Sequence, residues 1–387
     1  MTPRTNAGVK HRNGESPASQ APAGALRRAL SPHYSAYLDL IRFSAAAMVV
    51  LHHLKLLQVG PESVRKFIPS YGHEFVIVFF VLSGYVIAAT VDRKRHHQLI
   101  DYALDRAARI YSVLIPTLLI SSLVSLFLWI QHEPGAGTLR EIPLTLALNL
   151  AFLSQSWAVN AVPASNPAFW SLPYEVMYYV LYGCLHFLRG RQRIFWCVLV
   201  ALIAGPRILL LLPCWLVVVA AYRWRDRLAV NRPVAWLLVA SPVLVFGLLA
   251  YLRFGAAMRA AMEAQLGAYY AQLAWSADFP KDYISAVFLA LHLVAVRRLD
   301  LSLPRWLERA AVSAAALTFT LYLLHFPTIM LTRWAFGSSS QSAACIVSAL
   351  VFVTVATWLV GSYSEARRGE FRAMLVKHAK PRLTRRS

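Results

Sequence analysis

Long apolar runs separated by short polar stretches make up most of this chain. A run of about 20 apolar residues can cross the hydrocarbon core of a bilayer as a helix. The pattern therefore predicts an all-α membrane protein, a bundle of about ten transmembrane helices. They are expected at 37–58, 73–91, 110–131, 168–188, 194–205, 207–222, 233–252, 280–297, 310–335 and 341–363. Only Gly205 and Pro206 separate the two short runs, which allows a tight helical hairpin or one broken helix.

The run 142–157 is ambiguous. It has about 16 residues and contains Asn149 and Gln155, so it suits an interfacial or re-entrant segment better than a span. If it does not cross, most of the 39 Lys and Arg lie on the same side as both termini, as the positive-inside rule requires. If it crossed, the segment RGRQR at 189–193 would face outward. The charges favour ten helices with both termini cytoplasmic.

Composition agrees with this interpretation, because 58% of residues are hydrophobic and only 15% are charged. The net charge of +21 would indicate nucleic acid in a soluble protein, but membrane topology accounts for it here and no nucleic-acid partner is predicted. We expect a disordered basic cytoplasmic tail over 1–36, a membrane domain over 37–364 and a second basic cytoplasmic tail over 365–387. The four cysteines lie in apolar runs without a CxxC pair, so neither a disulfide nor a metal site is predicted.

The first apolar run, YLDLIRFSAAAMVVLHHLKLLQ, carries the most informative pair, Arg42 and His53. Ionisable groups at membrane depth are costly, so their presence favours a function. An interval of eleven residues is about three helical turns, roughly 16 Å, and places both side chains on one face. Snorkelling of both residues to the headgroups is the alternative, but it does not explain the shared face. The helix is predicted to present a fixed cation and a titratable base at different depths.

Two further features lie on the second and third predicted helices. Arg106 and Arg109 stand at i and i+3 where the third apolar run begins. Two guanidinium groups with this spacing can clamp a diphosphate, although ordinary positive-inside anchoring would also place them there. Ser83 and Gly84 lie in the middle of the second run. Such a small pair usually lets helices pack closely, and the alternative is that Gly84 leaves room for a ligand chain.

Three residues on the later runs complete the candidates. Trp170 lies where the fourth run begins and would suit an interfacial aromatic belt. Glu175 lies inside that run, where a carboxylate needs a cation or a proton, and His53 or Arg333 is expected at a comparable depth. His325 could be a second base, a substrate ligand or a histidine hydrogen-bonded between helices.

Several familiar chemistries have no motif in this chain. The sequence contains no GxSxG nucleophile elbow, no GxxxxGK[ST] phosphate loop and no HExxH metal motif. An enzyme built from these residues would transfer a group with a base and cations, without a metal or a familiar protein nucleophile.

In this order, the motifs resemble those of the acyltransferase 3 family, ten-helix membrane enzymes that O-acylate envelope and exported polysaccharides. The resemblance covers Tyr37 to Ser364. It is carried by LD-x-x-R with Arg42-x10-His53, by FVIVFFVLSGYVI, by Arg106-x-x-Arg109-Ile-Tyr and by NPAFWSLPYE with Glu175, supported by LYLLHFP at 321–327.

The resemblance implies a cytoplasmic acyl-CoA donor, acetyl-CoA in the simplest case, and an acceptor glycan or lipid-linked glycan on the far face. By position it implies that Arg42, His53 and Glu175 are catalytic. It also implies that Arg106 and Arg109 bind the coenzyme A phosphates, and that Arg42 binds the same cofactor by helping to hold its pantetheine arm and thioester. We expect the substrate to contact Trp170, His325 and Ser83.

Three departures from the family pattern concern shape rather than charge. Ser112 replaces a frequent proline, Tyr85 a frequent phenylalanine, and Pro173-Tyr174 the usual Ser-Val before the glutamate. The sequence therefore predicts a multi-pass acyltransferase of the bacterial inner membrane that acetylates a sugar hydroxyl. The alternatives are the same fold transferring succinyl or another acyl group, and a non-enzymatic lipid or glycan transporter. A transporter would be favoured by inverted repeats, which the sequence does not display.

Overall fold

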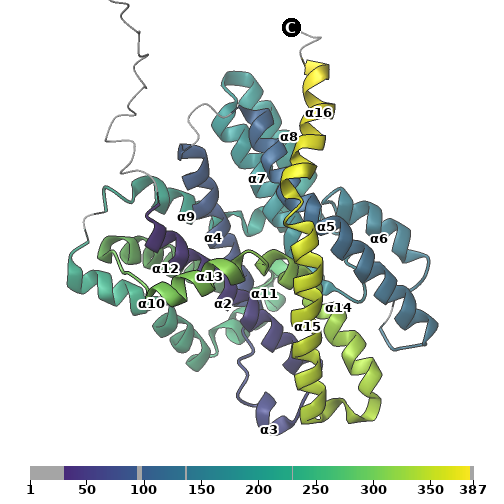
Figure 1. The fold of residues 1–387 in the computed structure, drawn as a ribbon. Coiled ribbons are helices and arrows are strands. Elements are labelled where there is room, and N and C mark those ends of the chain that lie inside the picture. Colours follow the sequence, from purple (N-terminus) through teal and green to yellow (C-terminus); the bar gives the residue numbers. More distant parts are fainter. Residues whose placement is uncertain (1–29, 94–97, 136, 229, 384–387) are drawn as a thin grey trace, which may run out of the picture.

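The computed structural model describes residues 30–93, 98–135, 137–228 and 230–383, and these residues form helices and connecting segments without a strand (Figure 1). The predicted all-α membrane fold is confirmed. The helices that fall in the predicted apolar runs are α2 (Pro32–Leu56), α4 (Gly72–Arg93), α5 (Leu99–Ile130), α7 (Ser171–Phe187), α8 (Gly190–Leu210), α9 (Leu212–Trp224), α10 (Arg232–Tyr251), α12 (Phe279–Leu299), α14 (Thr318–Phe336) and α15 (Ala343–Ser364). Shorter or peripheral helices are α3 (Glu62–Arg65), α6 (Glu141–Leu150), α11 (Phe254–Leu266), α13 (Arg305–Ala315) and α16 (Arg368–Leu383).

The predicted count of ten spanning helices is not confirmed. Within the described residues, seven helices are long and apolar enough to cross a membrane, and an eighth is added if α13 and α14 are taken as one bent span. Two of the predicted spans correspond to α7 and α9, which have 17 and 13 residues and fall short of the about 20 that a straight span needs. The placement of both termini in the cytoplasm stays a prediction.

The first membrane helix starts earlier than expected. The side chain of Ser31 accepts a hydrogen bond from the backbone N–H of Tyr34, and Pro32 occupies the first helical position. A serine cap followed by proline is a strong start signal for a helix. The helix therefore begins five residues before the predicted boundary at residue 37. The remainder of the predicted N-terminal tail, residues 1–29, lies outside the described part of the chain.

The predicted span over 310–335 is not one straight helix. The chain bends by 60° between α13 and α14. The helix α13 carries Arg305, Glu308 and Arg309 and exposes 71% of Trp306, while it packs the buried Ala311 inward and lies against α2. Its charges favour a position at the membrane surface, so the apolar α14 has to turn away from it.

The predicted break at Gly205 is present, because two helical segments of α8 meet there at a kink. Gly205 has φ = +77°, and the chain continues in α8 to Leu210. A side chain at this position would meet the backbone N of Trp157 at 2.7 Å. Glycine therefore serves both the left-handed backbone and the close approach. The ambiguous run 142–157 contains α6, whose ten residues are too short to span.

Two segments expected to be irregular or short are helical. The helix α5 begins at Leu99, eleven residues before the predicted span, so Arg106 and Arg109 lie inside it rather than at its start. With 32 residues, α5 is longer than the hydrocarbon core. The predicted C-terminal tail contains α16, which packs on α5 through an ion pair of Arg372 with Asp105. Between the predicted spans 233–252 and 280–297, the chain forms α11 and a 3-10 segment, Gly267–Ser276.

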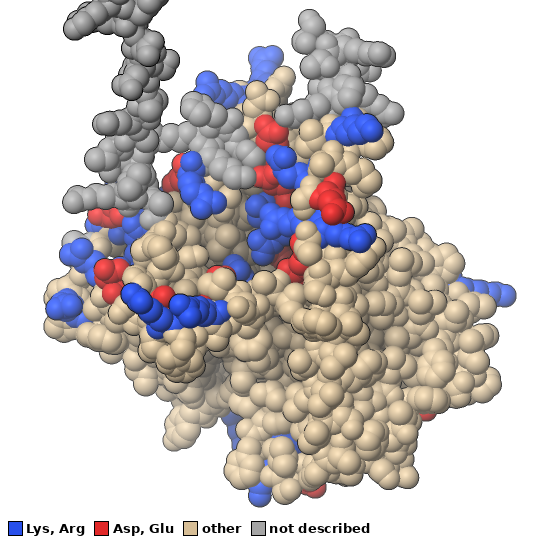
Figure 2. Space-filling view, viewed as in Figure 1, with Lys and Arg blue, Asp and Glu red and all other residues tan. Residues whose placement is uncertain are grey.

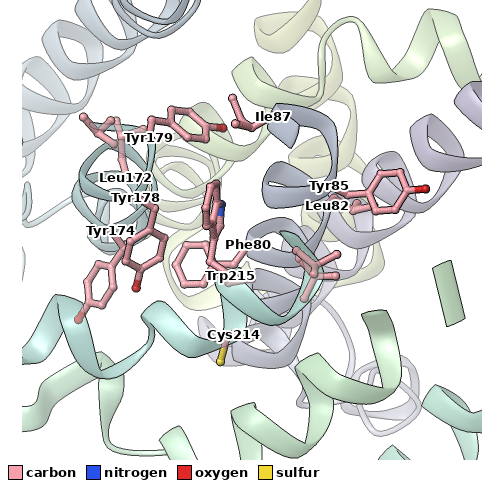
Figure 3. Close-up of a cluster of buried hydrophobic side chains, with 14 of the residues drawn as sticks. Phe80, Leu82, Tyr85, Ile87, Leu172, Tyr174, Tyr178, Tyr179, Cys214 and Trp215 are labelled. Atoms are coloured by element: carbon pink, nitrogen blue, oxygen red, sulfur yellow. The ribbon is translucent and has the colours of Figure 1, made fainter. Parts of the chain in front are cut away.

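An aromatic core joins α4, α7 and α9 (Figure 3). Phe80 of α4 stacks on Tyr174 and meets Tyr178 edge-on. Trp215 of α9 packs against Tyr178 and Tyr182 from the other side. Rings of this size bury large areas and fix the distances between helices. Phe80 also lines the cavity described below, so this core supports one side of that cavity.

Charged side chains divide the molecule into two halves (Figure 2). In that view, Lys, Arg, Asp and Glu gather in the upper half, which carries α16 and the ends of α4 and α7, and the lower half shows a broad uncharged surface. This distribution matches the side on which the sequence predicts the cytoplasm.

Candidate active site

A cavity of about 300 Å³ lies among α2, α4, α5, α7 and the junctions of α13 with α14 and of α15 with α16. Its lining combines apolar side chains with a charged group, as in many sites for ligands that have an apolar and an anionic part. The charged residues are Asp39, Arg42, Arg106, Arg109, Glu175, Glu365 and Arg368. The cavity lies towards the charged half of the molecule, because the contributing parts of α2, α5 and α16 belong to that half.

The three predicted arginines meet in this cavity. Arg42 reaches it from α2, and Arg106 and Arg109 reach it from α5. Arg42 Nη1 donates to Asp39 Oδ1 at 3.0 Å. The Nε of Arg106 is buried and has no hydrogen-bond partner among the described residues. A buried donor without a partner is costly, so this guanidinium is available to an anion that enters the cavity.

Glu175 also faces the cavity, and Tyr179, one turn later on α7, donates a hydrogen bond to its Oε1. The electrostatic neighbours of Glu175 are Arg109, Arg42 and Arg106. The bundle turns this carboxylate towards these arginines rather than towards His53 or Arg333, which the sequence places at a comparable depth. The structure brings together two of the three predicted catalytic residues, Arg42 and Glu175.

Ser83 and Gly84 on α4 have different roles, one at the cavity and the other in helix packing. Ser83 lines the cavity, where its hydroxyl accepts a hydrogen bond from Trp215 Nε1 at 3.0 Å. Gly84 packs against α9, and a side chain there would come within 2.7 Å of Val218 Cγ1. Gly84 is thus a helix-packing position, whereas Ser83 remains accessible to a substrate.

The two candidate histidines, His53 and His325, lie outside the lining of the cavity and contact each other. Nε2 of His325 is 2.9 Å from Nδ1 of His53. Tyr322, one turn before His325 on α14, lines the cavity, and the centroids of these two rings are 6.1 Å apart. The histidine pair is therefore one aromatic ring away from the cavity wall.

Trp170 lies apart from the cavity and is only 4% exposed. Its ring stacks with His73 and with Trp275, at centroid distances of 5.5 and 5.1 Å. His73 Nε2 is 2.9 Å from the carboxylate of the fully buried Asp282. This network joins α4, α12 and the 3-10 turn Pro167–Trp170. In this structure Trp170 is a packing residue, and its predicted contact with substrate stays a prediction.

Three charged residues of the cavity, Asp39, Glu365 and Arg368, were not among the site residues predicted from the sequence. Glu365 accepts a hydrogen bond from Thr320 Oγ1 at 2.8 Å, which joins the end of α15 to α14. Arg368, at the start of α16, lies on the rim of the cavity. Glu365 and Arg368 both follow directly after the last apolar run. That position was a possible signal, but flanking charges are expected after any span.

Comparison with known proteins decides the family. Residues 35–362 match the family described as "Acyltransferase domain". The chain belongs to the acyltransferase 3 family. A segment of 158 residues is 30% identical to a protein of Shigella phage Sf6 named "O-acetyl transferase". The match covers 39% of this chain and 46% of the phage protein, so the chain spans about half the length of that relative. No solved structure matches this acyltransferase 3 protein.

Proposed function

We propose that this protein is a membrane O-acyltransferase of the bacterial inner membrane. It takes an acyl group, acetyl in the first instance, from cytoplasmic acyl-CoA and transfers it to a hydroxyl of a surface or exported glycan. Family membership and the phage relative support O-acyl transfer in general. The donor, the acceptor and the membrane are part of the proposal.

The observation that carries the proposal is the meeting of Arg42, Arg106 and Arg109 in one cavity. Guanidinium groups suit phosphate oxygens because they offer paired donors in a fixed plane. The cavity also has apolar walls, formed by residues such as Phe79, Val113 and Phe319. A coenzyme A thioester has both parts, an anionic nucleotide and a long, less polar arm.

Arg42 and His53 lie on one helix, about three turns and roughly 16 Å apart. A donor whose phosphates sit at the arginines can extend its arm along α2 towards His53. In one version, His53 takes the proton of the acceptor hydroxyl while the oxygen attacks the thioester carbonyl. The carbon–sulfur bond breaks, and the departing thiolate takes that proton. In the other version, His53 attacks the thioester carbonyl and the carbon–sulfur bond breaks to release the coenzyme A thiolate. The sugar oxygen then attacks the acyl-imidazole, the carbon–nitrogen bond breaks to restore His53, and the hydroxyl proton goes to the thiolate.

The test follows label from radioactive acetyl-CoA, supplied on the cytoplasmic side of proteoliposomes, into a lipid-linked glycan extract. The variants are His53→Ala and Arg106→Ala. We expect His53→Ala to lower the turnover number at least about 10²-fold, because it removes the base. Arg106→Ala should mainly raise the KM for acetyl-CoA. Arg191→Ala is the matched control, since Arg191 is exposed and lies outside the cavity.

Two results would contradict the proposal. Full transfer by His53→Ala would remove the histidine from the chemistry. Failure to consume either acetyl-CoA or succinyl-CoA, with the glycan extract present, would favour the transporter. Consumption of succinyl-CoA alone would keep the enzyme and change the acyl group.

A further inference from the structure

The hydrogen bonds of His325 have a fixed direction. His325 is fully buried on α14. Its Nδ1 lies 3.2 Å from the carbonyl oxygen of Leu321, one turn earlier on the same helix. A carbonyl oxygen can only accept a hydrogen bond, so Nδ1 of His325 carries a hydrogen and donates it.

The second nitrogen of His325 then determines the state of His53. A neutral imidazole has one N–H, so a hydrogen on Nδ1 leaves Nε2 of His325 as an acceptor. Its partner at 2.9 Å is Nδ1 of His53, which must therefore carry a hydrogen. The neutral His53 ring with its hydrogen on Nδ1 has its lone pair on Nε2, and the carbonyl oxygen of Val49, one turn earlier on α2, is a second acceptor for this ring. The chain of bonds runs from His53 through His325 to the Leu321 carbonyl.

The opposite direction would need a charged His325. An imidazolium donates from both nitrogens, and it would turn His53 into an acceptor at Nδ1. Such a charge inside the bundle is costly unless an anion is nearby. Within the described residues, no salt bridge joins His325 to a carboxylate; its ring contacts the backbone carbonyls of Leu321 and Tyr322 and the ring of His53.

We propose that His325 is a positioning residue that holds His53 in the tautomer with its hydrogen on Nδ1. Nε2 of His53 is then the atom that takes the hydroxyl proton or attacks the thioester, which rests on the function proposed above. The proton that Nε2 gains passes on to the departing thiolate, and none leaves through His325. While His53 is positively charged, its bond to His325 becomes charge-assisted and stabilises it.

The surroundings hold the ring of His53 in this orientation. Phe326 meets it edge-on, with centroids 5.0 Å apart, and His52 does so at 5.2 Å. In this proposal His325 acts on His53 and not on a substrate. Of the three roles that the sequence left open for His325, this is the hydrogen bond between helices.

The direct test is nitrogen NMR on full-length protein with ¹⁵N-labelled histidine in detergent, with the His53 signals assigned by their loss in His53→Asn. We expect wild type to carry the hydrogen on Nδ1 of His53. His325→Leu fills the space without an acceptor and should give a mixture of tautomers. His325→Gln offers an amide oxygen to the same hydrogen and should restore the Nδ1–H form. A hydrogen on Nε2 in wild type, or no change in His325→Leu, would overturn the proposal.

Kinetics with acetyl-CoA and the lipid-linked glycan extract give a second readout. His325→Leu should lower kcat by about 10²-fold with little change in the KM for acetyl-CoA, and His325→Gln should recover to within about tenfold of wild type. Thr332→Val is the control, because it removes a buried hydroxyl from the same helix. Wild-type kcat in His325→Leu would overturn the positioning role. Wild-type transfer by His53→Ala would instead contradict the proposed function and leave the tautomer result standing.

Discussion

Single side chains set the charge of the cavity. Four arginines and three carboxylates line it, which gives 4 − 3 = +1 if all are ionised. All three carboxylates already accept a hydrogen bond, Asp39 from Arg42, Glu175 from Tyr179 and Glu365 from Thr320. The arginines on α5 and α16 are therefore the groups free to meet an anionic ligand.

Arg368 gives a prediction at this scale. It is exposed at the rim of the cavity, where an ion pair contributes about 1 kcal/mol at most. Arg368→Ala should raise the KM for acetyl-CoA about fivefold and leave kcat unchanged. The neighbouring Arg367 lies over the ring of Tyr363 and outside the cavity, so Arg367→Ala is the matched control. Equal KM values in the two variants would remove Arg368 from donor binding.

The breaks within helices decide which residues reach the cavity and which segments pack together. The bend between α13 and α14 places Val312, Ala315 and Thr318 on the cavity wall. A straight helix over this stretch would not bring residues from both α13 and α14 to the cavity. The kink at Gly205 plays a similar part on α8, because it lets the backbone of Trp157 approach.

Gly205→Ala tests the kink. Alanine would have to adopt a positive φ and would press its Cβ against the backbone of Trp157. We expect a loss of about 1–3 kcal/mol in stability, measured as a lower unfolding midpoint in detergent. Gly247→Ala is the control, since a side chain there meets nothing within 4 Å and lies inside α10. It should be neutral or stabilising by up to about 1 kcal/mol. Equal midpoints for the two variants would mean that α8 adapts freely.

Most charged side chains gather in one half of the molecule, with a smaller group at the opposite end beyond a broad uncharged surface, and this asymmetry predicts the orientation of the protein in the membrane (Figure 2). The turn between α7 and α8 lies in the charged half, and α3 lies at the opposite end (Figure 1). A reaction that begins with a cytoplasmic donor and ends on an outer glycan requires this orientation.

Labelling of intact cells with a membrane-impermeant maleimide checks the orientation. A cysteine in place of Lys66, exposed next to α3, should react from outside. A cysteine in place of Arg191, exposed at the start of α8, should react only after permeabilisation. Wild type gives the background, because Cys184, Cys214 and Cys345 are buried and Cys197 is partly buried. The reverse labelling pattern would invert the topology.

Sequence by itself determined the class of this protein, its family and the list of charged candidates. These follow from local properties: the length of apolar runs, the positions of basic residues, and the helical repeat that puts Arg42 and His53 on one face. These properties can be identified without knowing which helices contact each other. The same reasoning correctly left 142–157 outside the set of spanning helices, and α6 is short.

Only the tertiary structure decided which candidates share a site. Glu175 faces Arg42, Arg106 and Arg109, His53 contacts His325, and Trp170 packs against His73. These contacts join residues far apart in the chain, and their choice depends on how the bundle is packed rather than on any one helix. Local patterns did not predict the bend before α14 for the same reason. Nor did they predict that α16 begins where Arg368 joins the cavity.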